Sequence, residues 1–192
     1  MTAMLITGPA AEPVTLAEAK AHLRVDSSDE DTLISSLITA ARIHIELACS
    51  KVLITQGWKI YFDRWPSKTA VDIPIAPLRG ISAVTIYDAE DNGQSLDPSG
   101  WYADLVSAPG RLVRRFAGLW PDPGRPANGI EITVSAGYGD AASDVPQTLR
   151  QAILLLVAHW FETREPVALG EGAISVPLAV DALIAPARAV RL

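Results

Sequence analysis

The sequence contains almost no cysteine, and this scarcity excludes two kinds of architecture. Of its 192 residues only Cys49 is a cysteine, so no intrachain disulfide and no cysteine-rich metal site can form. Such a chain is expected in a reducing compartment. No neighbouring motif would activate Cys49 as a nucleophile, so we expect it to be a small, buried, apolar side chain.

The chain also has fewer basic than acidic residues. The chain has 16 basic and 22 acidic residues, which gives a net charge of −6 and a pI near 5.0. A protein that grips nucleic acid through its phosphates is expected to be basic, so the composition speaks against that class. Charged residues make up 20% and hydrophobic residues 49%, so a globally disordered chain is excluded.

Long apolar runs and a basic N-terminus are both absent. The most apolar run extends from Ala152 to Phe161 and contains His159, so it is too short to span a bilayer. The segment from Met1 to Pro13 has no basic residue and does not predict a signal peptide. We therefore expect a soluble protein without a membrane partner, present in the cytoplasm when it is made.

Proline is missing from two long windows, which predict the helices. No proline lies within 14–65 or 147–165, whereas eight of the 14 prolines lie within 66–126. Because a helix interior excludes proline, the two windows can hold long helices. The proline-rich stretch between them predicts short strands and turns.

The first window predicts two helices. Thr15 and Glu18 form a capping-box pattern that begins a helix ending near Val25. The acidic run 26–31 supplies an N-cap and first-turn acids for a second helix. Apolar residues then recur at helical spacing as far as Cys49.

The second window predicts a helix over 147–164, begun by Asp144 as N-cap and Pro146 in the first turn. Apolar side chains cover nearly its whole circumference, which predicts burial all round. With only two other helices in the chain, part of that burial is expected from a neighbouring subunit. The residues predicted to form the core or a subunit interface are Leu33, Leu37, Leu149, Ile153, Leu156, Trp160 and Phe161.

Between the two windows the apolar period changes to two, which predicts strands. Alternation is visible at 58–62, 84–87, 112–116 and 130–134, and Asn92-Gly93 gives a turn. The fold class is therefore α+β, because helices and strands are segregated along the chain.

We expect a single domain over 1–192 with three parts. A small helical core takes in 15–50 and 144–165, and a β-rich insertion takes in 52–142. A loop and an extended C-terminal tail over 166–192 complete it, with a short helix predicted from Leu178 to Ile184.

Catalytic and metal-binding patterns are absent. The acidic run fails the EF-hand pattern, since the sixth position is Asp31 where glycine is required and the twelfth is Leu37 where glutamate is required. His22, His44 and His159 are far apart in sequence and form no ligand pair. No nucleophile elbow, P-loop or dinucleotide fingerprint is present. We therefore predict no catalytic, cofactor-binding or metal-binding residues, no cofactor and no enzymatic activity.

Arg111, Arg114 and Arg115 form the only local basic cluster, beside Phe116 and Trp120. An aromatic and basic patch can bind single-stranded nucleic acid. However, the region 52–143 contains eight basic and ten acidic residues, which favours a solvated strand face or a salt-bridged subunit contact.

Three segments together resemble a known family. They are Val14–Asp26 followed by the acidic stretch and Leu33–Ile38, then Leu154–Glu165, and finally Val176–Pro186. In order and spacing they are similar to the head–tail connector (adaptor) family of tailed bacteriophages and of phage-derived gene transfer agents. The resemblance covers both ends of the chain and, loosely, its middle.

The resemblance implies a ring, usually of twelve copies, below the portal protein of a DNA-filled head. Such a ring continues the DNA channel toward a downstream head-closure or tail protein. It is found in the neck of a virion or gene transfer agent particle, and in the host cytoplasm before assembly. Double-stranded DNA would pass without specific binding, and an acidic subunit suits that passage because its wall does not hold phosphates. The alternative is another neck or tail-completion protein.

The resemblance also implies that the C-terminal segment docks on the portal. Here the tail Pro177–Leu192 corresponds to it, and we expect it to be unfolded until it binds. Its deletion is then expected to leave the fold intact and to abolish particle joining. The predicted docking residues are Val176, Pro177, Leu178, Val180, Leu183, Ile184, Arg188, Val190, Arg191 and Leu192.

Overall fold

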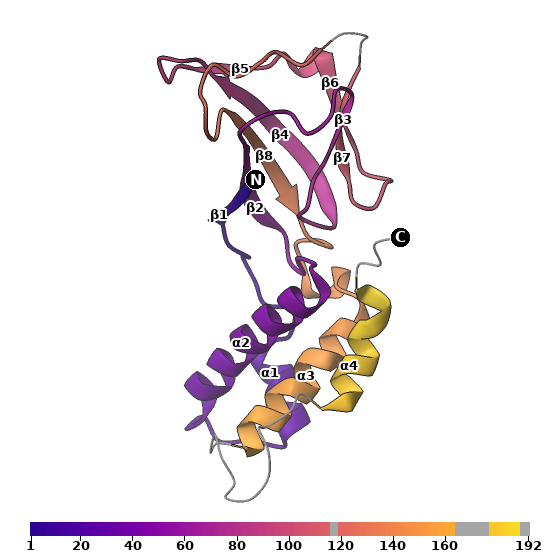
Figure 1. Cartoon of the computed structure of the whole chain (residues 1–192). Helices are drawn as coiled ribbons and strands as arrows, with labels where there is room; N and C mark the ends of the chain where they lie inside the picture. Colours follow the sequence, from indigo (N-terminus) through magenta and orange to yellow (C-terminus); the bar gives the residue numbers. More distant parts are fainter. Residues whose placement is uncertain (116–118, 164–176, 189–192) are drawn as a thin grey trace, which may run out of the picture. The chain divides into compact units, whose positions relative to one another are not determined.

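The computed structural model describes residues 1–115, 119–163 and 177–188 (Figure 1). It confirms the α+β class, with helices and antiparallel sheets in separate parts of the chain. The chain forms two compact units. The strand unit comprises Met1–Pro9 and Thr55–Tyr138, and the helical unit comprises Ala10–Ile54 and Gly139–Leu192.

The helical unit contains four helices: α1 (Leu16–Leu23), α2 (Asp31–Cys49), α3 (Gln147–Glu162) and α4 (Leu178–Ile184). The helices α1, α2 and α4 all contact α3. The predicted capping box is confirmed: Thr15 Oγ1 accepts from Glu18 N at 3.2 Å, and Thr15 N donates to Glu18 Oε2 at 2.8 Å. The short helix predicted from Leu178 to Ile184 has these bounds in the structure.

The acidic run 26–31 supplies the N-cap residue of α2, Glu30, and the first-turn acid Asp31, as predicted, but Glu30 makes no side-chain capping bond. The predicted N-cap of α3 is wrong. Asp144 accepts from Ala141 N and so closes the 3₁₀ turn η2 (Ala142–Asp144). Pro146 is the N-cap of α3.

α3 is less buried than its composition predicts. Its fully buried side chains are Leu149, Ala152, Ile153, Leu156 and Val157. The remaining apolar residues over 154–161 are half-buried. An apolar surface is therefore left on α3 within the part of the chain that the structure describes.

α2 is long and apolar enough to cross a membrane by length and composition alone. However, it buries one face in the helical unit and carries the buried cation Arg42 on it. These are properties of a core helix.

The strand unit holds a five-stranded antiparallel sheet in the order β1-β2-β8-β4-β5. Its strands are β1 (Thr2–Thr7), β2 (Gln56–Phe62), β4 (Leu78–Tyr87), β5 (Gly93–Ser95) and β8 (Ile130–Ala136). In the three central strands Ile60 pairs with Ile132, which pairs with Val84. All three side chains are fully buried and form the centre of the core.

A second sheet of three short strands covers this core. It runs in the order β3 (Ala70–Asp72), β7 (Arg111–Arg114) and β6 (Trp101–Asp104). Val71 and Leu112 are paired across it and belong to the same apolar cluster as Ile60 and Val84. The strand predicted over 112–116 is β7, and the end of that prediction lies outside the described residues.

β1 has no counterpart among the predicted strands. Its sequence, Thr-Ala-Met-Leu-Ile-Thr, has no polar and apolar alternation, and all six residues are exposed in the strand unit. Because β1 has no buried face, its sequence does not show the period of two that marks a half-buried strand. The predicted insertion, 52–142, encloses the rest of the strand unit, and Met1–Pro9 joins it from the other end of the chain.

Candidate functional site

The predicted docking tail begins as part of the helical core. Val180 and Ile184, one turn apart on α4, are 0% and 1% exposed. Cys49, at the end of α2, places its Sγ 3.9 Å from the carbonyl oxygen of Ile184. Cys49 is 1% exposed, so the predicted small, buried side chain is confirmed, and this burial raises the pKa of its thiol.

The outer face of α4 carries a different set of predicted residues. Leu178 is 86% exposed, Leu183 and Pro177 are half-buried, and Arg188 is exposed. Val176, Val190, Arg191 and Leu192 lie outside the described residues. The structure therefore divides the predicted docking set into an inward pair, which holds α4 in place, and an outward set that a partner can reach.

Charge at the end of α4 is locally balanced. Arg188 Nη2 lies 2.8 Å from Asp181 Oδ1, and both side chains are 47% exposed. The ion pair joins the first turn of α4 to the residue after the 3₁₀ turn η3 (Ala185–Ala187). An exposed pair of this kind contributes little stability.

The predicted core and interface residues separate in the same way. Leu149, Ile153 and Leu156 of α3 are fully buried, so they belong to the core of the helical unit. The half-buried members are Leu33, Leu37, Trp160 and Phe161. Trp160 meets His44 edge to face, with ring centroids 5.9 Å apart. The half-buried group remains a predicted subunit interface.

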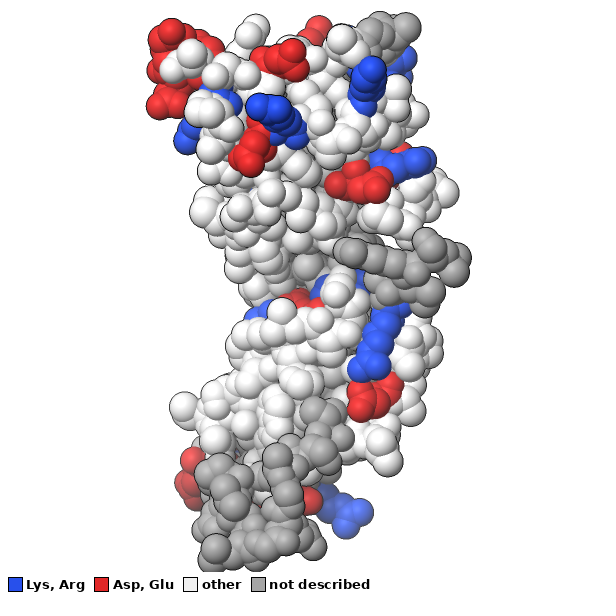
Figure 2. Space-filling model, viewed as in Figure 1, with Lys and Arg blue, Asp and Glu red and all other residues white. Residues whose placement is uncertain are grey.

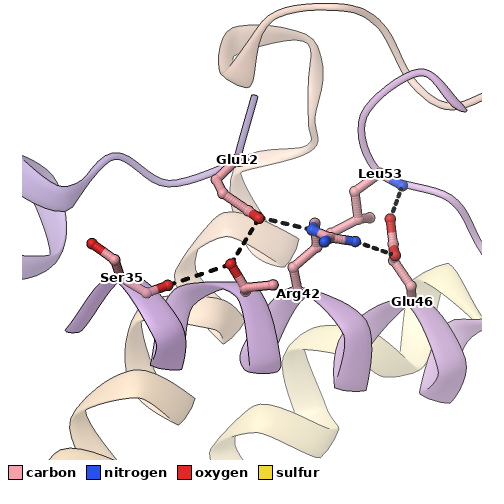
Figure 3. Close-up of polar contacts among 6 residues, drawn as sticks. Glu12, Ser35, Arg42, Glu46 and Leu53 are labelled. Atoms are coloured by element: carbon pink, nitrogen blue, oxygen red, sulfur yellow. Dashed lines mark hydrogen bonds and ion pairs between the residues drawn. The ribbon is translucent and has the colours of Figure 1, made fainter. Parts of the chain in front are cut away.

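A charged network that the sequence did not predict holds α2 to two connecting segments (Figure 3). Arg42 is 7% exposed. Its Nε donates to Glu12 Oε2 at 2.8 Å and its Nη1 to Glu46 Oε2 at 2.8 Å. Thr39 Oγ1 donates to Glu12 Oε1 at 3.0 Å, and Leu53 N donates to Glu46 Oε1 at 2.9 Å.

This network fixes the chain on both sides of α2. Glu12 lies in the segment that follows β1, and Leu53 in the segment that precedes β2. The network thus joins α2 to the segments on either side of it within the helical unit. The only local signal was the Arg42–Glu46 spacing of four residues, which is common on helices.

The capping box of α1 is joined to α3 by an ion pair between Glu18 and Arg150. Arg150 Nε also donates to the carbonyl oxygen of Pro13 at 2.9 Å. Hydrogen bonds from Thr15, together with Arg150, hold the pKa of Glu18 below its ordinary value of 4.5, although burial opposes them.

The pKa of Glu18 predicts an acid-sensitive contribution to stability. A carboxylate whose pKa is lower in the folded state stabilises the fold above its unfolded pKa, and this contribution disappears as the pH falls through the folded value. We expect Glu18→Gln to lower the unfolding free energy by less than about 1 kcal/mol at pH 7, since the pair is partly exposed. The difference from wild type should be smaller at about pH 4 than at pH 7, and it should go on shrinking as the pH falls through the lowered pKa of the folded state. Urea titrations at both pH values test this, and an equal difference at both would contradict it.

The basic cluster predicted near β7 is largely occupied by partners within the strand unit. Arg111 Nη2 lies 2.6 Å from Asp104 Oδ2. The guanidinium carbons of Arg114 and Arg115 lie 5.7 Å and 5.4 Å from the ring centroids of Trp120 and Tyr102. Phe116 lies outside the described residues. These contacts favour the predicted salt-bridged or solvated face over a nucleic-acid patch.

An open pocket of about 810 Å³ lies beside this cluster. Trp65 and Trp120 stack there with ring centroids 4.5 Å apart, and Trp65 Nε1 donates to Pro121 O. Arg64 and Lys68 line it together with Asp63 and Asp122, so its charges are mixed. Figure 2 likewise shows acidic and basic side chains interspersed on the viewed face.

Glu131 forms a second polar cluster that the sequence did not predict, on one face of the large sheet. It accepts from Lys59 Nζ at 2.8 Å and from Tyr87 OH at 3.2 Å. Burial alone would raise its pKa, but the bonds from Lys59 and the neighbouring tyrosines lower it overall. The cluster satisfies a buried charge and joins β2, β8 and β4.

The three histidines stay apart. His22 lies on α1, His44 on α2 and His159 on α3. Nε2 of His159 is buried and has no hydrogen-bond partner among the described residues. Across the same residues, no group of three His, Cys, Asp or Glu side chains could hold a metal ion.

A family profile relates this chain to head-tail connector proteins, and solved structures relate it to the neck of gene transfer agent particles. The sequence profile of the phage gp6-like head-tail connector proteins matches residues 13–103. A subunit from the neck of an empty gene transfer agent particle, computed with C6 symmetry, has 30% identity and a TM-score of 0.84. A subunit from the neck of the native particle, computed with C12 symmetry, has 30% identity and a TM-score of 0.81.

A chain from the virion of a native gene transfer agent particle has 27% identity and a TM-score of 0.82. Each of the three likenesses covers 100% of this chain and 97% of the other. No curated protein sequence matches the chain. The likeness therefore extends over both units and over α4.

Proposed function

Because this chain belongs to the phage gp6-like family of head–tail connector proteins, we propose that it forms the ring that joins the portal of a DNA-filled head to the tail. The observation that carries the proposal is the full-length likeness to neck subunits at 30% identity. The family is a structural one, and the role is that of an adaptor in the neck of a particle. The C12 symmetry of one similar neck supports twelve copies.

In this proposal double-stranded DNA passes through the ring without being bound specifically. A net charge of −6 on each copy gives the ring no general attraction for phosphates. Arg111 is paired with Asp104, and the guanidinium groups of the two neighbouring arginines lie over aromatic rings, so the predicted basic cluster already makes contacts within the strand unit. A channel built from such subunits would let the duplex pass toward a downstream head-closure protein.

The outer face of α4 is the surface that we propose for portal docking. Leu178 offers the most exposed large apolar side chain on that helix, and Arg188 adds a cation that an acidic portal surface would attract. Val180 and Ile184 contribute to docking only indirectly, because their burial holds α4 against α3 and α2. A helix that is held in place in this way loses less entropy on binding than an unfolded segment does.

The test is a substitution on the outer face of α4. We expect Leu178→Asp to weaken binding to purified portal by about tenfold or more, because a carboxylate would replace an apolar contact. Val106→Asp is the matched control, since Val106 is 97% exposed in the strand unit. Binding is measured by sedimentation of portal with the labelled chain. Equal binding by the two variants would contradict the docking assignment.

A further inference from the structure

β1 is an edge strand that lacks the usual protection. It pairs with β2 and with no other strand of the described sheets. Every second residue of an edge strand turns its N–H and C=O away from the sheet, which makes the edge a template for another chain. Proteins shield such edges with lysine, proline or very short strands. β1 has six residues, no charge and no proline, and only an irregularity between Leu5 and Thr7 interrupts it.

The side chains of β1 are also uncovered. Met4, Leu5 and Ile6 are 48%, 47% and 44% exposed, and the preceding Met1 is 67% exposed. Because successive residues of a strand point to opposite faces, these exposed apolar side chains occupy both faces of β1. Among the described parts of the chain, both faces of β1 therefore leave apolar surface open to solvent.

Charge favours a second copy of this chain as the occupant. Each copy carries −6, so copies repel one another where their charges meet. The first eleven residues contain no charged side chain. A contact through this segment brings copies together without placing like charges side by side. In Figure 2 most charged side chains of the strand unit lie toward the top of the view, and few lie on the rest of its viewed face.

We propose that the free edge of β1 pairs with a strand edge of the neighbouring copy in the ring. The inference rests on the proposed function, because it presupposes a ring. A cyclic ring joins two different surfaces of each subunit, so β1 must meet an edge other than a second β1. The described sheets offer such edges at β5, which lies at the opposite end of the same sheet, and at β3 and β6.

The first test places a protective residue on the edge. Leu5→Lys introduces the charge that natural edge strands carry, and Val106→Lys introduces the same charge at another exposed apolar site. Each variant is mixed with portal, and the bound copies are counted by native mass spectrometry. We expect the wild type and Val106→Lys to give complete rings, and Leu5→Lys to give about tenfold fewer. Complete rings from folded Leu5→Lys would overturn the inference.

The second test needs no variant and reports on the backbone itself. Amide hydrogen exchange across Thr2–Thr7 is compared between the free chain and the ring on portal. Pairing between copies predicts slower exchange in this segment once the ring closes. Unchanged exchange in a closed ring would overturn the inference.

The remaining outcomes identify other occupants of the edge. Protection by portal at one copy per site, before any ring forms, would assign the edge to portal. A β1–β1 contact would stop at dimers. Either result overturns pairing around the ring but leaves the connector role intact. If wild-type chain does not bind portal at all, the proposed function fails together with this inference.

Discussion

Arg42→Ala is expected to lower the unfolding free energy of the helical unit by about 3 kcal/mol. Arg42 is buried between Glu12 and Glu46, with both contacts at 2.8 Å. Its removal takes this cation away from the partly buried carboxylates of Glu12 and Glu46. The cost is therefore that of uncompensated charge as well as that of the lost contacts. Urea unfolding followed by far-ultraviolet circular dichroism measures it.

An exposed arginine of the same unit provides the control. Arg188 also lies 2.8 Å from its partner, but its side chain is 47% exposed, against 9% for Arg42. Arg188→Ala should therefore cost less than about 1 kcal/mol. Combining Arg42→Met with Glu12→Gln and Glu46→Gln should restore most of the loss, because no buried charge then remains unpaired. If Arg42→Ala costs no more than Arg188→Ala, the network does not stabilise the unit.

Deletion of Pro177–Leu192 is expected to destabilise the helical unit by about 3–6 kcal/mol. The deletion removes Val180 and Ile184, which are fully buried, and full burial of each such side chain contributes about 1.5–3 kcal/mol. This burial argues against the sequence-based expectation that the deletion leaves the fold intact. Loss of particle joining by such a truncated chain would not by itself identify a docking tail.

Single substitutions separate folding from docking. Ile184→Ala keeps the whole tail and should cost about 2–5 kcal/mol through the cavity that it leaves. Leu178→Ala changes a side chain that is 86% exposed and should change stability by less than about 0.5 kcal/mol. Urea unfolding of both variants measures the difference. A stability for Ile184→Ala equal to that of wild type would show that α4 does not contribute to the core.

Much of this fold could be predicted because its signals are local. The capping box uses Thr15 and Glu18, three residues apart, and both hydrogen bonds form as the pattern requires. Proline-free windows located α2 and α3, and the apolar run before Pro186 located α4. Alternation revealed β2 and β8, because one face of each is buried.

The features that sequence reasoning missed depend on contacts between distant residues. Glu12 and Arg42 are 30 residues apart, and nothing in either local sequence predicts that they meet. β1 was missed because a strand exposed on both faces has no alternating pattern. The tail is predicted from the sequence to be unfolded until it binds, because its apolar side chains suit a partner as well as they suit α3. Composition alone cannot distinguish these two kinds of burial.

The central claim is that copies of this chain form a closed ring on the portal. The most direct measurement is electron cryomicroscopy of purified portal mixed with an excess of the chain. The proposal predicts a ring of twelve copies below the portal, with the outer face of α4 against it. Portal particles that carry no added density, or chain bound at isolated sites without a ring, would contradict it.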